Sequence, residues 1–91
     1  MTCYIYTPEE IFAEVDKLPD TRSKQQFILG TKHLKRDYGY TAPEQIYNVI
    51  GALKAYFSEA FGDYATCSPA ERRILEKCQE TVRTLNNMLY K

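Results

Sequence analysis

Three cysteines carry the most reactive side chains of this sequence, and they stand at positions 3, 67 and 78. No pair has C-x-x-C spacing, and no pairing resembles the spacing of zinc ligands. Cys78 falls on the apolar stripe of a predicted helix and is expected to be a small core residue. Cys67 directly precedes Ser68, the predicted cap of a helix, where a thiol can have a lowered pKa. Because no base or resolving cysteine stands nearby, we expect an incidental surface thiol, with a thiol-based redox activity as the alternative.

The other residue types that carry catalysis form no catalytic pattern. His33 is the only histidine, so no histidine-based metal site can close within one chain. Two carboxylate pairs, Glu10 with Glu14 and Glu76 with Glu80, each share a helix face, whereas glycoside hydrolysis needs carboxylates across a cleft. The four glycines are isolated and form no phosphate-binding loop, and no serine stands in a G-x-S-x-G motif. The sequence therefore nominates no catalytic, cofactor-binding or metal-ligating residue, and we do not expect an enzyme.

Composition narrows the class of protein further. The 91 residues are enough for one small domain, here 1–91 with a short N-terminal tail at 1–6, and 44% hydrophobic with 26% charged residues is typical of a globular chain. Twelve basic and twelve acidic residues give zero net charge, which excludes a strongly basic nucleic-acid binder. No apolar run approaches the roughly 18 residues of a membrane helix, and the N-terminus has no signal-peptide pattern. The odd cysteine count favours a reduced, cytoplasmic location.

The elements that must position these residues are predicted to be four helices with short connections. Capping boxes of the form S/T-x-x-E, each with a proline, stand at 7–10, 41–44 and 68–71. Asp20 is predicted to cap the remaining helix. The residues expected to stop helices are Pro19, Gly39 and Gly62. The predicted helices span about residues 8–18, 21–38, 42–61 and 69–89.

Apolar residues recur every three or four positions in the predicted helices, so each helix has one face to bury. The stripes of the two long helices contain Ile46, Val49, Ile50, Leu53, Phe57, Ala60 and Phe61, then Ile74, Leu75, Cys78, Val82, Leu85, Met88 and Leu89. The short first helix offers Ile11, Phe12, Val15 and Leu18. Faces of this kind predict an all-α fold, either a four-helix bundle or two packed helical hairpins.

The predicted helix 21–38 contains one residue that does not fit its core face. Phe27, Leu34 and Tyr38 define that face, with Gly30 and Thr31 allowing close approach of a neighbour. Leu29 lies in the middle of the opposite face, where the surrounding residues are Arg22, Gln25, Lys32, His33 and Arg36. The simpler interpretation, which we favour, is that another element of the same chain covers Leu29. The alternative is an exposed apolar spot ringed by cations, which is typical of a site for an acidic amphipathic partner.

Charge is also distributed unevenly along the chain. Residues 1–20 hold five acids and one lysine, and residues 21–39 hold five bases and one aspartate. The simpler interpretation is that the first two helices pack antiparallel and complement each other's charge. The alternative is a basic strip that binds phosphate or an acidic protein.

Eight tyrosines and no tryptophan are the remaining unusual feature. Tyrosine combines a large contact area with a polar end and is frequent at interfaces. The candidate partner-binding residues are Arg22, Leu29, Lys32, His33, Arg36, Tyr38, Tyr40 and Tyr47.

These features predict a small, non-enzymatic, helical interaction or adaptor protein that needs no cofactor or metal. We expect it to self-associate as a homodimer, because the first helix is too short to cover the apolar stripes of the two long helices. The alternative is a nucleic-acid-binding regulator that uses the basic face of the helix 21–38. A protein partner or a second copy is therefore expected, nucleic acid is a possible but less favoured partner, and no membrane contact is expected.

Overall fold

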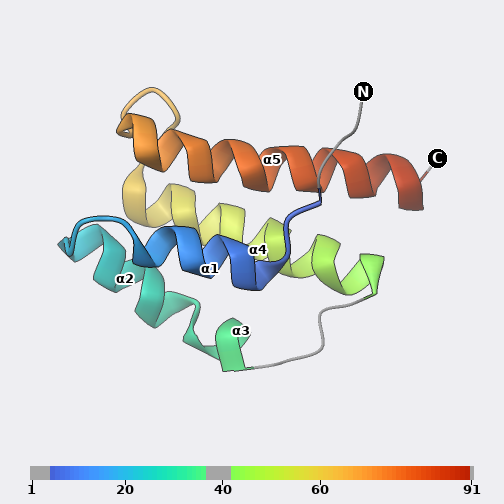
Figure 1. Cartoon of the computed structure of the whole chain (residues 1–91), viewed down its shortest axis with the longest axis horizontal. Helices are drawn as coiled ribbons and strands as arrows, with labels where there is room; N and C mark the ends of the chain where they lie inside the picture. Colours follow the sequence, from blue (N-terminus) through green and yellow to red (C-terminus); the bar gives the residue numbers. More distant parts are fainter. Residues whose placement is uncertain (1–4, 37–41, 91) are drawn as a thin grey trace.

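The computed structural model describes residues 5–36 and 42–90, and these residues form helices and no strand (Figure 1). The prediction of an all-helical fold is confirmed. The helices are α1 (Pro8–Asp16), α2 (Arg22–Gly30), α3 (Lys32–Arg36), α4 (Pro43–Phe61) and α5 (Pro69–Leu89). None of these five helices is long and apolar enough to cross a bilayer.

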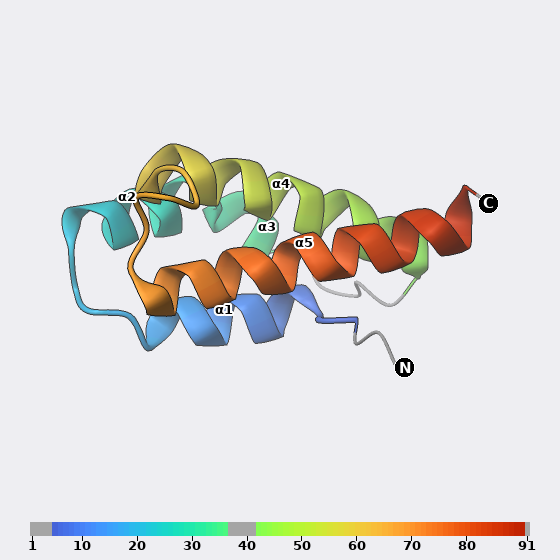
Figure 2. The ribbon, with the colours of Figure 1, turned by 90° about the horizontal axis from the view of Figure 1, so that it is seen from above.

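The two long helices, α4 and α5, run antiparallel and form the body of the bundle (Figures 1 and 2). The short helix α1 lies along α5 and also contacts α4, whereas α2 packs on α4 and runs in the opposite direction to it. α3 turns back toward α1. The 19-residue helix α4 passes through Gly51 without a break, so each long helix presents one continuous stripe to its neighbours.

One aromatic side chain joins three of the helices. Phe27 of α2 is 1% exposed. Its ring centroid lies 6.4 Å from that of Phe12 in α1, and 5.6 Å and 6.2 Å from those of Phe57 and Phe61 in α4. Most of the predicted core residues are buried around it, and Cys67, expected at the surface, joins them. The buried apolar residues are Ile11, Phe12, Val15, Leu18, Phe27, Ile46, Val49, Ile50, Leu53, Phe57, Cys67, Ile74, Leu75, Cys78 and Leu85.

Two of the predicted capping boxes are present with both of their hydrogen bonds. The backbone N–H of Thr7 donates to Glu10 Oε1 at 3.1 Å, and that of Glu10 donates to Thr7 Oγ1 at 3.3 Å. Ser68 and Glu71 make the same pair of bonds at the start of α5. Each box satisfies two N–H groups that have no partner inside the helix, so these starts are fixed by local sequence.

The other boundaries differ from the predicted ones. α2 is capped by Thr21, not Asp20, because Thr21 Oγ1 accepts the N–H of Lys24 at 3.2 Å. α4 begins with Ala42 at the N-cap, which has no side-chain acceptor of its own, and Gln45 Oε1 accepts the backbone N–H of Ala42 at 3.4 Å. Thr41 and Gly39, the residues predicted to start and stop helices there, lie outside the described residues. The predicted stop at Gly62 is confirmed, with φ of 93°, a conformation that favours glycine.

The end of α1 also falls earlier than predicted. The helix closes at Asp16 with Lys17 as its C-cap, before Pro19 is reached. Lys24 Nζ donates to the backbone carbonyl oxygens of Asp16 and Leu18, at 3.1 Å and 2.9 Å. A cation at a helix C-terminus satisfies carbonyl groups that the helix itself leaves unpaired. One lysine of α2 therefore fixes the connection between α1 and α2.

The segment predicted as one helix over 21–38 is two helices that meet at Thr31. Thr31 is fully buried, and its hydroxyl donates to the carbonyl oxygen of Phe27 at 2.7 Å. A threonine that bonds back to the carbonyl four residues earlier bends a helix. Gly30 directly before it lowers the helical propensity of the same turn. The backbone N–H of Leu34 then bonds to the carbonyl of Thr31 at 3.0 Å, and α3 continues at an angle to α2 (Figure 1).

The N-terminal segment is fastened to α5. Lys77 Nζ of α5 lies 2.8 Å from Glu14 Oε1, and Lys17 lies 3.1 Å from the other oxygen of the same carboxyl. Hydrogen bonds from Lys77 and Lys17 lower the pKa of Glu14 below its ordinary value. The backbone N–H of Tyr6 donates to Thr81 Oγ1 at 3.0 Å. The carboxylate of Glu14 is therefore neutralised from α1 and α5, not from α2 as the charge distribution suggested.

Replacing Phe27 by alanine is expected to lower the free energy of unfolding by about 3–5 kcal/mol, because the substitution leaves a cavity where three helices meet. The matched control is Leu29→Ala two residues along the same helix, which is expected to change stability by less than about 0.5 kcal/mol because that side chain is 72% exposed. Urea denaturation followed by circular dichroism measures both. Equal effects of the two substitutions would contradict the central position of Phe27.

Candidate functional site

Leu29 lies on the solvent side of α2 and is 72% exposed. The interpretation that another element of the chain covers it is wrong. α4 packs on α2, and Phe12 of α1 reaches Phe27 from the buried side of the helix, whereas Leu29 on the opposite side stays exposed. The preceding residue, Ile28, is itself 37% exposed, so two adjacent apolar side chains reach the surface of this helix.

The charged residues of α2 and α3 that neighbour Leu29 in sequence are basic, and one acid, Asp20, reaches the edge of this face, where its Oδ1 accepts a hydrogen bond from the side chain of Gln25 at 3.5 Å. Arg22 stands seven residues before Leu29, so the two share a helix face. Lys32 and His33 follow at the start of α3 and are exposed. The sequence contains no acid between residues 22 and 36, and in the part of the chain that the structure describes neither Arg22 nor Lys32 forms an ion pair. Leu29, Arg22, Lys32 and His33 are called the α2 surface below.

None of the remaining predicted partner-binding residues adds a described side chain to the α2 surface. Arg36 is the last residue of α3, and its side chain lies outside what the structure describes; Tyr38 and Tyr40 lie outside the described residues altogether. Tyr47 belongs to a different part of the molecule. Its hydroxyl donates to Asn86 Oδ1 at 3.4 Å and its ring lies 5.7 Å from that of Tyr90, so it packs between the beginning of α4 and the end of α5.

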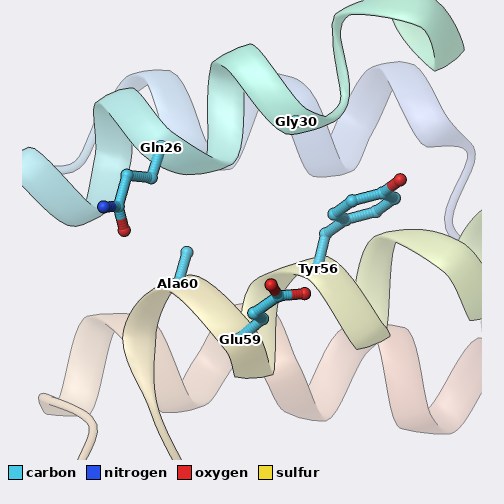
Figure 3. Close-up of a pocket in the computed structure, with 5 residues that line it drawn as sticks. All are labelled: Gln26, Gly30, Tyr56, Glu59 and Ala60. Carbon is cyan, nitrogen blue, oxygen red and sulfur yellow. The ribbon is translucent and has the colours of Figure 1, made fainter.

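A pocket of about 360 Å³ opens between α2 and α4 (Figure 3). Its lining residues are Gln26, Gly30, Tyr56, Glu59 and Ala60. The predicted close approach at Gly30 is confirmed, because a Cβ atom there would lie 3.3 Å from Cδ1 of the Tyr56 ring. The same ring lies at an interplanar angle of 73° to that of His33, with centroids 6.1 Å apart, which connects the pocket to the α2 surface.

The pocket is the feature that sequence reasoning missed. Glu59 falls on the polar side of the α4 stripe, and the structure does leave it exposed. Its position at a pocket depends on where α2 crosses α4, which helical periodicity does not reveal. The available signal was Gly30, since a glycine inside a helix often marks the close approach of another element.

A second exposed apolar area lies at the end of α5. Met88 is 56% exposed and Tyr90 is 64% exposed. Met88 was predicted to lie on the core stripe of its helix, and this placement is wrong. α1 has nine residues against the 21 of α5, so the stripe of α5 continues beyond the part that α1 covers.

Both described cysteines are buried thiols. Cys78 is fully buried in the core as predicted, and burial raises its pKa to about 12. Cys67 is 5% exposed and so is not the surface thiol expected. Its Sγ donates to the carbonyl of Gly62 at 3.5 Å. Burial, with the nearby carboxylate of Glu71, raises the pKa of Cys67, which opposes the expected effect of the helix N-terminus.

No group of three or more potential metal ligands gathers within residues 5–36 and 42–90. No family model matches the chain, and neither a curated protein nor a solved structure is similar to it. The α2 surface and the adjoining pocket are therefore the features from which a function is argued.

The two buried thiols are expected to react slowly. In a Cys3→Ser variant, native protein at about pH 8 should be alkylated by iodoacetamide at least roughly tenfold more slowly than the same protein in urea, because the thiolate is the nucleophile. The native rate should still rise above about pH 9, where an ordinary thiol is already largely ionised. Mass spectrometry of quenched samples gives the rate at each cysteine. Fast native labelling of Cys67 would instead support the redox alternative.

Proposed function

We propose that this protein is a small, non-enzymatic interaction protein that binds an acidic amphipathic helix of a partner on the α2 surface. The observation that carries the proposal is the 72% exposure of Leu29 on a helix whose own charged residues are all basic, with Asp20 at the edge of the same face. Covering a leucine side chain completely contributes about 1.5–3 kcal/mol. An apolar partner residue on Leu29 would supply this energy.

The basic residues supply orientation and selectivity. Each exposed ion pair contributes about 0–1 kcal/mol, so Arg22 and Lys32 discriminate between partners more than they strengthen binding. A partner helix with acidic residues beside its apolar stripe satisfies both features of the surface. A basic helix would place like charges against Arg22 and Lys32, which disfavours it.

The cellular setting is part of the proposal. The free thiols of Cys67 and Cys78 support a reducing compartment, and we place the protein in the cytoplasm on that basis. The alternative partner, nucleic acid, would use the same cations but would leave Leu29 without a role. For this reason we favour a protein partner.

We also propose that two copies associate through the end of α5. The supporting observation is the exposure of Met88 and Tyr90 beyond the part of α5 that α1 covers. A two-fold symmetric contact would bury the same residues on both copies. This contact lies on α5 and uses no residue of the α2 surface, so the dimer leaves that surface free for a partner.

Leu29→Asp is expected to weaken binding of an acidic amphipathic peptide at least about tenfold, because it replaces the apolar contact by a charge that repels the peptide. The probe is a fluorescent helical peptide of roughly 16 residues, with leucines at i, i+4 spacing flanked by glutamates. Fluorescence anisotropy measures the dissociation constant. Met88→Asp is the matched control and is expected to bind the peptide as the unsubstituted protein does.

Two further ligands decide between the partner classes. A peptide with lysines in place of the glutamates should bind far more weakly, and a duplex oligonucleotide should bind without dependence on Leu29. The proposal is overturned if the basic peptide binds as tightly as the acidic one, or if Leu29→Asp and Met88→Asp behave alike. Tight duplex binding that falls steeply with salt would support the nucleic-acid alternative.

In light scattering over a hundredfold range of concentration, the mass is expected to approach twice the 10.6 kDa of one chain. Met88→Asp should hold the protein as a monomer, because each copy would have to bury an aspartate charge in the symmetric contact. Leu29→Asp is the control here and should dimerise normally. A monomer at every concentration would rule out self-association.

A further inference from the structure

The pocket between α2 and α4 combines one carboxylate, one amide and one aromatic ring. In Figure 3 the side chains of Gln26, Glu59 and Tyr56 stand around the gap between the two helices. Gln26 reaches down from α2, and the other two come from α4, three residues and one helical turn apart. Gly30 and Ala60 complete the lining. Glycine has no side chain and alanine only a methyl group, so neither fills the space.

We propose that this pocket binds an organic cation, namely a guanidinium or ammonium group on a short aliphatic stem. Glu59 supplies the negative charge, and in the part of the chain that the structure describes it forms no ion pair with any cation of the protein. The Tyr56 ring offers an aromatic surface, which attracts a cation within about 6 Å of its centre. The side-chain oxygen of Gln26 accepts a hydrogen bond from the same group.

The chemistry of the lining disfavours other ligand classes. An anion would be repelled by Glu59, although Arg22 and Lys32 lie on the neighbouring surface. A wholly apolar ligand would remove water from a carboxylate and an amide without replacing their hydrogen bonds, which is unfavourable. The volume of about 360 Å³ is at the lower end of ligand sites, which run from about 300 to 1,000 Å³, so the ligand is a small molecule or a single side chain.

The same cationic group can come from two sources. One is a free alkylguanidine or amine, and the other is an arginine or lysine side chain of a protein. The proposal does not depend on the peptide bound at the α2 surface. Variants of Leu29 test that surface and variants of Glu59 test this pocket, so the two can fail separately.

The experiment is a titration of isotope-labelled protein with butylguanidinium, followed by NMR. The amide signals of Gly30, Glu59 and Ala60 are expected to move together and to saturate with a dissociation constant on the order of millimolar. Butylurea has almost the same shape without the charge, so it is the matched ligand control. It should bind at least about tenfold more weakly.

Glu59→Gln removes the charge and keeps the shape of the side chain, and it is expected to weaken butylguanidinium binding at least about tenfold. The matched control is Glu44→Gln, roughly 22 Å away along the same helix, which should leave binding unchanged. Both glutamates are exposed, so both variants are expected to keep the native spectrum. Comparable binding of butylurea, unchanged binding by Glu59→Gln, or no saturable shift with butylguanidinium would each overturn the proposal.

A second pair of ligands distinguishes the sources of the cation. Arginine blocked at both ends carries the group as a protein does, and blocked citrulline is its neutral counterpart. If blocked arginine binds at least as tightly as butylguanidinium and blocked citrulline does not, the pocket accepts a side chain of a partner protein. If butylguanidinium alone binds, the pocket is selective for a small free cation. Either result supports a cation site, and binding of blocked citrulline as tight as that of blocked arginine would count against it.

Discussion

The packing of Phe27 against aromatic rings of α1 and α4 is the contact on which the rest of the structure depends. This side chain holds α2 on the bundle, and the same helix carries Leu29 on its other side. A helix of nine residues is marginal on its own, so it keeps its position only through such tertiary contacts. The exposure of Leu29 and the shape of the pocket at Gly30 both follow from where Phe27 places α2.

The sequence was sufficient to predict the features that local chemistry determines. Apolar periodicity identified most of the buried residues of α1, α4 and α5, and Phe27 in α2, while the capping boxes at Thr7 and Ser68 located two helix starts. The other helix boundaries were predicted less well, because several neighbouring residues can satisfy the unpaired backbone groups of a helix terminus. At the start of α2 the hydroxyl of Thr21 accepts the N–H of Lys24 and so caps the helix, a role expected of Asp20.

The features that were missed depend on which face of one helix meets another. Thr31 breaks its helix because its hydroxyl is buried, where it must find an acceptor inside the protein. Leu29 is exposed because α4, together with Phe12 of α1, contacts α2 on the opposite side, at Phe27. Helical periodicity shows that a face exists, but not which neighbour covers it. For the same reason, the position of Glu59 on the polar side of the α4 stripe indicates that it faces solvent but not that it lines a pocket.

The N-terminal helix obtains its neighbours late during synthesis. The bond from Tyr6 to Thr81 spans 75 residues, and that from Lys77 to Glu14 spans 63. Because α1 precedes α5 in the chain, the part of α1 that packs on α5 stays uncovered during synthesis until α5 has been made. Contacts so distant in sequence also slow folding. Earlier segments can already contact α1 through Phe27 and α4, but the bundle closes only when α5 is present.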